Sequence, residues 1–240
     1  MVPHGLLPVS ESIMPIVEGA NTFYERNCSV GRTVYILSDS WAFLILRESY
    51  FGAKRFDTFQ SALGLPRQTL TQRLRKLTAQ GLLLRVKCSG SSLRFEYGLT
   101  EMGIDLYPVM LSLMSFGDKW LKGSNPPPLG LIHNNCGCAC HPIVACNHCK
   151  TEVNVRTVTY RDGPGAGRTP IGETLKETRP SDRNILDRGR PSSVARALKV
   201  IGDRWSFMLI REGFFGVRRF DILQNKLGIA PNACHAGLGR

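Results

Sequence analysis

The sequence contains one segment twice. Residues 28–66 align without a gap with residues 192–230, and 16 of the 39 aligned positions are identical. Most of the other pairs exchange one apolar residue for another. Self-similarity at a fixed spacing indicates a duplicated structural module. The first copy continues into further patterned sequence, whereas the second leads into the segment NACHAGLGR, so we expect one complete module and one truncated module.

Positive charge is in excess and is concentrated in the first copy. The chain has 31 Lys and Arg residues against 19 Asp and Glu residues, a formal net charge of +12. Residues 28–100 contain 11 basic and 4 acidic residues, which gives +7 of that total. A basic surface of this kind favours a polyanionic partner such as double-stranded DNA. A solvated basic surface without a specific partner would have the same composition.

The composition suits small folded domains joined by a linker. Apolar residues make up 42% of the 240 residues, enough to bury one or two cores. No apolar run approaches the roughly 18 residues of a membrane span, and the start of the sequence lacks the pattern of a secretion signal. We therefore expect a cytoplasmic protein with no membrane contact. The predicted divisions are an N-terminal tail (1–27), a first module (28–121), a cysteine-rich segment (122–159), a flexible linker (160–190) and the truncated module (191–240).

The first module begins with a run of predicted helices. Apolar residues recur at helical spacing over residues 30–37, 41–52 and 56–63. Side-chain oxygens in residues 38–40 can cap the second of these helices. Pro66 then suits the first position of a fourth helix.

The fourth helix, predicted over residues 67–80, has one apolar face and one polar, basic face. Leu70, Leu74 and Leu77 fall on a single stripe. Glutamine can pair with adenine and arginine with guanine in the major groove, so the opposite face predicts contacts with DNA bases. An ordinary amphipathic helix with a solvated polar face would show the same pattern. The residues expected to meet DNA are Arg67, Gln68, Thr69, Thr71, Gln72, Arg73, Arg75 and Lys76.

After Gly81 the pattern changes to the alternation typical of strands. Residues 82–99 alternate on both sides of a Ser- and Gly-rich turn, which predicts a two-stranded hairpin. Helices followed by a basic hairpin form a winged helix-turn-helix, a mainly α fold with a small β-sheet. Lys87 and Arg94 would contact phosphate from this wing.

A further apolar helix is predicted over residues 102–120. Thr100 can cap it, and apolar residues recur at helical spacing from Leu106 to Trp120. Such a helix after a complete small domain often builds a homodimer. It would equally pack back onto the core of its own module.

Several motifs of the first module resemble a known family. They are Trp41 with Leu46-Arg47-Glu48, Gly52 through Arg55-Phe56, the segment LTQRLRKL, and Glu96-Tyr97 followed by Leu99-Thr100. With a cysteine before the first helix, residues 28–120 look like the HxlR-type winged helix family of bacterial transcription regulators. Residues 192–231 resemble the same family again.

The resemblance implies a DNA-binding repressor or activator that acts as a homodimer. In that family the fourth helix enters the major groove and the terminal helices build the dimer, which here implies a recognition helix at 67–80 and a dimer helix at 102–120. Some members sense oxidants or electrophiles through an N-terminal cysteine, which makes Cys28 a candidate redox sensor. A buried cysteine beside a helix start is commonly inert, and the second copy has Ser192 at this position.

The truncated copy departs from the family pattern. It keeps the scaffold residues but has no recognition helix beyond Pro231 and no wing, so we do not expect it to read DNA. A role in dimerisation or as a lid is one alternative. The other is that it does not fold, because the apolar residues Phe207, Ile210 and Phe214 would be partly uncovered.

The middle segment has the spacing of a metal site. His133-x-x-Cys136 and Cys146-x-x-Cys149 form two short pairs separated by a loop, an arrangement that lets four ligands converge on Zn²⁺. We predict a structural zinc held by these four residues in a zinc-ribbon-like segment. A catalytic zinc or unliganded reactive thiols are the alternatives. Other ligands available nearby are Cys138, Cys140, His141 and His148.

These observations favour a sequence-specific transcriptional regulator. The alternative is a protein-interaction adaptor that uses the zinc ribbon and the winged helices for docking. An enzyme is disfavoured, because the sequence shows no nucleophile-and-base set, no phosphate-binding glycine loop and no paired carboxylates at helical spacing. No organic cofactor is expected.

Overall fold

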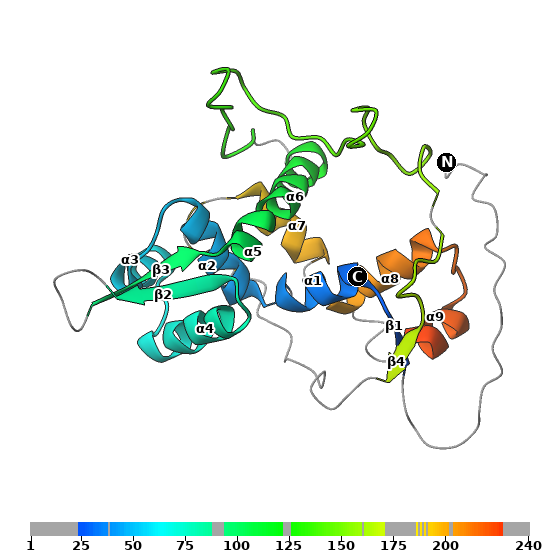
Figure 1. Cartoon of the computed structure of the whole chain (residues 1–240), viewed down its shortest axis with the longest axis horizontal. Helices are drawn as coiled ribbons and strands as arrows, with labels where there is room; N and C mark the ends of the chain where they lie inside the picture. Colours follow the sequence, from blue (N-terminus) through cyan, green and yellow to red (C-terminus); the bar gives the residue numbers. More distant parts are fainter. Residues whose placement is uncertain are drawn as a thin grey trace. The chain divides into compact units, whose positions relative to one another are not determined.

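The chain divides into two compact units that do not follow the two repeats. The computed structural model (Figure 1) describes residues 24–37, 39–87, 94–121, 126–159, 161–170, 186, 188, 190, 192–201 and 204–227. The large unit comprises residues 36–160 and 181–202, and the small unit comprises residues 1–35, 161–180 and 203–240. The beginning of the second repeat therefore groups with the first repeat.

Helix α2 (Ser40–Tyr50) lies at the centre of the large unit. Asp39 caps it, and Asp39 Oδ1 accepts hydrogen bonds from the amides of Trp41 (3.1 Å) and Ala42 (3.3 Å). These bonds satisfy donors that a helix start leaves without partners. Nine of the eleven residues of α2 are buried. The helix is apolar on most sides because neighbouring elements cover it on most sides.

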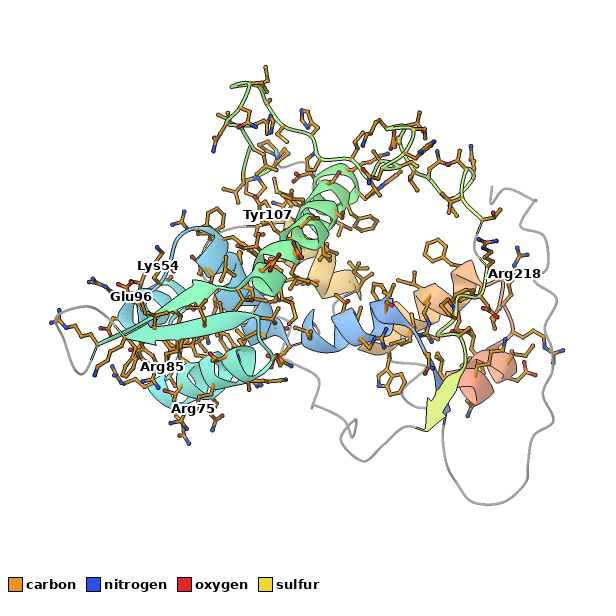
Figure 2. The ribbon with its side chains drawn as sticks, in the orientation of Figure 1. Lys54, Arg75, Arg85, Glu96, Tyr107 and Arg218 are labelled. Carbon is orange, nitrogen blue, oxygen red and sulfur yellow. The ribbon has the colours of Figure 1, made fainter. Side chains whose placement is uncertain are left out.

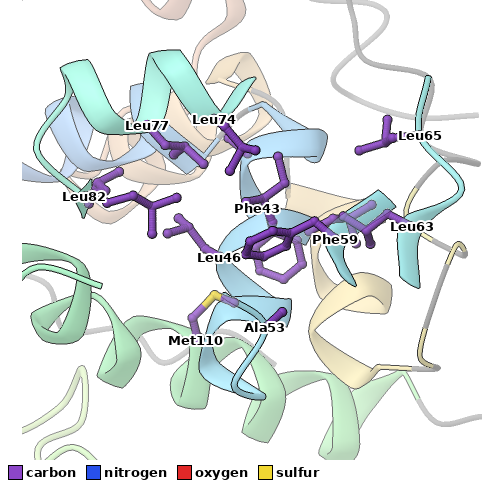
Figure 3. Close-up of a cluster of buried hydrophobic side chains, with 14 of the residues drawn as sticks. Phe43, Leu46, Ala53, Phe59, Leu63, Leu65, Leu74, Leu77, Leu82 and Met110 are labelled. Atoms are coloured by element: carbon purple, nitrogen blue, oxygen red, sulfur yellow. The ribbon is translucent and has the colours of Figure 1, made fainter. Parts of the chain in front are cut away.

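Helices α3 (Phe56–Leu63) and α4 (Arg67–Ala79) form the helix-turn-helix. Gly64 ends α3 with a φ of +59°, a left-handed conformation that glycine adopts without steric cost. The leucine stripe predicted for α4 is fully buried. Figure 3 shows Leu74 and Leu77 in one cluster with Phe43 and Leu46 of α2. Burial of this stripe fixes which face of α4 remains exposed.

The predicted wing is a two-stranded antiparallel sheet. Strand β2 (Leu83–Lys87) pairs with β3 (Phe95–Leu99), with Leu83 opposite Leu99 and Lys87 opposite Phe95. Residues 88–93 at the tip lie outside the described part of the chain. Leu82 and Leu83 are buried, so the base of the hairpin is anchored in the core while β2 is exposed further out.

The helix predicted over residues 102–120 is two helices, α5 (Glu101–Asp105) and α6 (Tyr107–Trp120). Thr100 caps α5, as expected, through a hydrogen bond from the amide of Gly103 to Thr100 Oγ1 (3.0 Å). The break falls at Leu106, because Pro108 has no amide hydrogen and is tolerated only in the first turn of a helix. Met110 and Gly117 of α6 are buried against the rest of the unit.

The large unit also contains helix α7 (Ser193–Ile201), which packs along α6. Figure 1 shows the two helices side by side. Val194, Ala195 and Leu198 belong to the same buried core as the residues of α2 and α4, and so does Leu186, which falls within the predicted linker.

The small unit is built from segments far apart in the sequence. Strand β1 (Tyr24–Arg26) pairs in antiparallel fashion with β4 (Arg168–Pro170), within the predicted tail and linker. Helices α8 (Arg204–Phe214) and α9 (Phe220–Leu227) form a small core of Met208, Leu209 and Leu227. Helix α1 (Ser29–Leu37) begins in the small unit and ends in the large one.

Residues 126–159 contain three tight turns in place of regular elements. Isolated antiparallel bridges join Ile132 to Ala139 and Ala145 to Glu152, one around each predicted ligand pair. In the described part of the chain, no helix is long and apolar enough to cross a membrane.

Candidate nucleic-acid interface

Helix α4 presents a polar face to solvent. Arg67, Gln68, Gln72 and Arg75 are exposed, and the last three follow one another at the spacing of a single helix face. In Figure 2, Arg75 extends outward from α4. Thr69 and Thr71 are half-buried at the edges of this face, and Thr71 Oγ1 donates a hydrogen bond to the carbonyl of Arg67 at 2.8 Å. Amide and guanidinium groups are therefore free to contact a surface outside the unit.

Two of the predicted DNA-contacting residues have a partner inside the unit. Arg73 Nη1 donates to Asp39 Oδ2 at 2.5 Å, and Lys76 Nζ lies 3.6 Å from the same oxygen. The Asp39 side chain is only 6% exposed. A buried carboxylate bound to two cations fixes α4 relative to the start of α2. These two side chains orient the exposed face of α4 formed by Gln68, Gln72 and Arg75, which we call the reading face. Because both are half-buried, they extend less far into solvent than the residues of that face.

Asp39 is a functional residue that sequence reasoning missed. No acidic residue occurs between Gln60 and Glu96, so α4 itself offers no carboxylate partner. The partner is 34 positions before Arg73, and only the packing of α2 against α4 brings the two together.

The wing carries further positive charge. Lys87 and Arg94 are exposed at the ends of the two strands nearest the tip. Arg85, which the sequence did not single out, places its guanidinium carbon 3.6 Å from the centre of the Phe95 ring, a geometry that holds an arginine by cation–π attraction. Lys54 is also exposed, and its carbonyl accepts a hydrogen bond from the amide of Tyr97 at 2.7 Å.

Acidic residues lie at the margin of this surface. Arg55 Nε is 3.2 Å from Glu96 Oε1, and Arg67 Nη1 is 3.8 Å from Asp57 Oδ1. Both pairs are exposed, so water screens them and each contributes at most about 1 kcal/mol to stability. The Arg67 guanidinium also lies 4.9 Å from the centre of the Phe56 ring. These contacts link α3 to the start of α4 and to the wing.

Each of the two predicted ligand pairs lies in its own hydrogen-bonded turn. His133 Nδ1 lies 3.3 Å from Cys136 Sγ, and the amide of Gly137 donates to the carbonyl of His133 at 2.8 Å. Within the residues that the structure describes, no three His, Cys, Asp or Glu side chains come close enough to hold one ion.

The second pair has a similar turn. The amide of Lys150 donates to the carbonyl of Cys146 at 2.8 Å, and Cys149 Sγ lies 2.9 Å from Thr151 Oγ1. Hydrogen bonds from Thr151, and then from Cys146, lower the pKa of Cys149. A lowered thiol pKa favours the thiolate, the form that binds metal.

Cys28 is a free, half-buried cysteine directly before α1. Its role as a redox sensor stays a prediction.

Comparisons with known proteins agree with this geometry. A model of the HxlR-like helix-turn-helix matches residues 36–125. The uncharacterized HTH-type transcriptional regulators Rv3095 of Mycobacterium tuberculosis and Mb3122 of Mycobacterium bovis are each 44% identical over 137 residues, which is 57% of this chain and 87% of each relative. The chain belongs to the HxlR-like helix-turn-helix family.

Other relatives share fewer identical residues with this chain. The regulator sll1512 of Synechocystis is 34% identical over 96 residues, 40% of this chain and 71% of its own length. Among solved structures, the crystal structure of PA1607, a candidate transcription factor, superimposes with a TM-score of 0.51 at 28% identity, over 57% of this chain and 96% of that chain.

Membership confirms the resemblance predicted from the motifs of the first module. This HxlR-like protein is a transcriptional regulator of the helix-turn-helix type, mainly helical with a small two-stranded sheet beside the helix-turn-helix.

Proposed function

We propose that the protein binds a specific double-stranded DNA sequence by placing α4 in the major groove. The observation that carries this proposal is the division of α4 into a fully buried leucine face and an exposed face of Gln68, Gln72 and Arg75. Arginine and glutamine can each form two hydrogen bonds with one base edge, to guanine and adenine respectively. Direct base contacts would then give the sequence preference.

Phosphate contacts supply most of the affinity in this proposal. The wing residues Arg85, Lys87 and Arg94 are exposed cations beside the reading face, and Lys54 adds a fourth. Neutralising phosphates releases counterions, so binding weakens steeply as salt concentration rises. Contacts of this kind orient a protein on the duplex without reading its sequence.

The test is fluorescence anisotropy with a duplex selected from a random pool and with an unselected duplex, over a series of salt concentrations. We expect both duplexes to bind more weakly as salt rises and the selected duplex to bind more tightly at every salt concentration. Arg75→Ala should reduce the preference, whereas Arg218→Ala, the same change at an exposed arginine of the small unit, should leave it unchanged. Equal binding of both duplexes by the wild type would contradict the proposal.

We also propose that two copies associate through α6, the second of the two helices in the predicted dimer region. Along one edge of α6, Val109, Phe116 and Trp120 are 36%, 41% and 65% exposed. A second copy would remove these side chains from water. Sedimentation velocity tests this pairing: Trp120→Ala should shift the protein toward the 26.6 kDa monomer, and Ile210→Ala, at an exposed apolar residue of the small unit, should not.

We propose a structural zinc for the middle segment. His133, Cys136, Cys146 and Cys149 would hold it, and the two hydrogen-bonded turns that contain these pairs support the proposal. The ion would tie the two turns into a ribbon. Elemental analysis of the purified protein should find about one zinc per chain, which Cys149→Ser should lower and Cys138→Ser should not. A wild-type protein purified without chelators and free of metal would contradict this proposal.

A further inference from the structure

Helix α7 and Leu186 are an integral part of the large unit, although α7 belongs to the second repeat. Ala197 is fully buried, and Leu186 is 1% exposed. Val194, Ala195 and Leu198 share a core with Phe43, Leu46 and Met110. The segment therefore completes the core of the large unit.

The backbone just before α7 also satisfies a buried arginine of the first module. Arg47 and Glu48 form an ion pair of 2.8 Å whose side chains are 4% and 3% exposed. Arg47 donates further hydrogen bonds to the carbonyls of Arg190 (3.0 Å) and Arg188 (3.1 Å). Burial of a guanidinium is stable only when its donors have partners. Burial also lowers the pKa of Arg47, an effect that Glu48 opposes.

The helices α6 and α7 approach so closely that a side chain would not fit between them. A Cβ atom added to Gly117 would lie 2.2 Å from the carbonyl oxygen of Ser193. Ser193 Oγ donates a hydrogen bond to Asp118 Oδ1 beside this contact. Backbone contact at a glycine together with a polar pair indicates a specific interface.

The repeat alignment shows that this arrangement is an exchange. Helix α7 aligns with α1, yet it packs in the unit that holds α2 to α6, while residues 1–35 group with α8 and α9. Strand β1, which lies just before the first repeat, contacts α9 of the second. Each unit thus combines the beginning of one repeat with the later helices of the other.

The second repeat contains the same ion pair in different surroundings. Arg211 and Glu212 reproduce the buried ion pair at 2.9 Å, with side chains 7% and 3% exposed. Among the residues that the structure describes, Arg211 Nη1 is buried without a hydrogen-bond partner, whereas the aligned nitrogen of Arg47 donates to the carbonyl of Arg190. The carbonyls at 188 and 190 that precede α7 bind the arginine of the other repeat.

We propose that α7, together with the carbonyls of Arg188 and Arg190 before it, takes the place of the first helix in the first module, exchanged between repeats within one chain. Helix α7 from the second repeat of the same molecule then covers the surface formed by α2 and α6. A second molecule does not cover that surface. Exchange of identical elements is a known route to dimers, and a tandem repeat allows it inside a single chain. This surface lies apart from the exposed edge at Val109, Phe116 and Trp120, and the inference does not depend on DNA binding.

Cysteine cross-linking of full-length protein tests the exchange. The double variant Asp118→Cys/Ser193→Cys is treated with a short bifunctional thiol reagent, and the peptides linked between positions 118 and 193 are mapped by mass spectrometry. In parallel, Asp118→Cys chains and Ser193→Cys chains with different tags are co-expressed and treated alike. We expect the 118–193 link in the double variant and not in the co-expressed pair. A link between co-expressed chains, or none in the folded double variant, would overturn the proposal.

A glycine substitution provides an independent test in the same background. Gly117→Ala should abolish the 118–193 link, because its methyl group would collide with the backbone of Ser193. Gly213→Ala is the matched control, since a Cβ at this position of α8 has no atom within 4 Å. The link should persist in the Gly213→Ala protein. Persistence of the link at wild-type yield in Gly117→Ala would also overturn the proposal.

Discussion

The two repeats place aligned residues in different surroundings. Phe43 and Leu46 in α2 are fully buried. In α8, the residue aligned with Leu46 is Ile210, which is 43% exposed, and the residue aligned with Tyr50 is Phe214, which is 57% exposed. The helix α2 lies among α3, α4, α6 and the base of the wing, whereas the described part of the second repeat ends with α9. The same apolar pattern is thus buried only where later elements cover it.

The buried ion pairs lead to the same conclusion. Arg47–Glu48 and Arg211–Glu212 have nearly equal geometry, but within the described part of the chain only Arg47 has carbonyl partners for the rest of its guanidinium. A local motif can therefore be retained in sequence while its energetic contribution depends on segments elsewhere in the chain.

Removing the buried arginine should have the largest effect. We expect Arg47→Met to lower the free energy of unfolding of the large unit by about 3–5 kcal/mol, because it leaves Glu48 as an unpaired buried charge. Arg211→Met should cost the small unit less, because one of its donors already lacks a partner. Urea unfolding followed by peptide-resolved hydrogen exchange separates the two units. Equal losses at both sites would show that the carbonyl partners contribute nothing.

Replacing the aligned residues Leu46 and Ile210 by alanine tests whether their difference in burial appears as a difference in stability. We expect Leu46→Ala to cost about 2–5 kcal/mol through lost apolar burial and the cavity it leaves. Ile210→Ala should cost less than about 1 kcal/mol, because much of its side chain is already in water. The same unfolding experiment measures the loss of unfolding free energy for both variants. Similar losses at the two positions would contradict the difference in burial between α2 and α8.

Asp39→Asn tests the contact between α2 and α4. Asparagine keeps the cap of α2, but the charge that pairs with Arg73 and Lys76 is lost. We expect a loss of about 1.5–3 kcal/mol, the value of hydrogen bonds to charged groups. Thermal unfolding of Asp39→Asn measures this loss. The matched control is Arg55→Gln, which removes the charge from the exposed Arg55–Glu96 pair. A loss no greater than that of Arg55→Gln would remove the orienting role of Asp39.

The smallest predicted effect concerns Tyr50, which is Phe214 in the second repeat. Burial, with a smaller contribution from Tyr107, raises the pKa of Tyr50 to about 12, and its hydroxyl donates to the carbonyl of Gly103 at 2.6 Å. Because ionisation is easier in the unfolded chain, the stabilising contribution is complete below pH about 10 and is lost as pH rises toward 12. Unfolding free energy measured across this range should fall less steeply in Tyr50→Phe. If the unfolding free energies of the wild type and Tyr50→Phe fell in parallel with pH, the raised pKa would not belong to Tyr50.

The sequence predicted most of the local structure of the first module. The leucine spacing of α4 predicted its buried face, and the Ser- and Gly-rich turn predicted the wing. Pro108 explains the break between α5 and α6, a break that apolar periodicity alone does not show. The reading face could be predicted because burial of three leucines leaves Gln68, Gln72 and Arg75 outside.

Contacts between distant segments could not be predicted. The partner of Arg73 is on another helix, and the carbonyls that bind Arg47 come from residues more than 140 positions later. The predicted division into residues 28–121 and 191–240 carries no information on which first helix packs in which unit. Periodicity reports which face of a helix is buried but carries no information on which segment covers it.

The central claim is that α4 reads bases while the wing holds phosphate. Its most direct test is a comparison of Gln72→Ala with Lys87→Ala, with affinity measured for a selected site and for every single-base variant of it. We predict that Gln72→Ala relaxes the preference at one or two base pairs by about 1–3 kcal/mol, and that Lys87→Ala weakens all sequences alike and reduces the salt dependence. A uniform loss from both substitutions would contradict the assignment of α4 as the reading element.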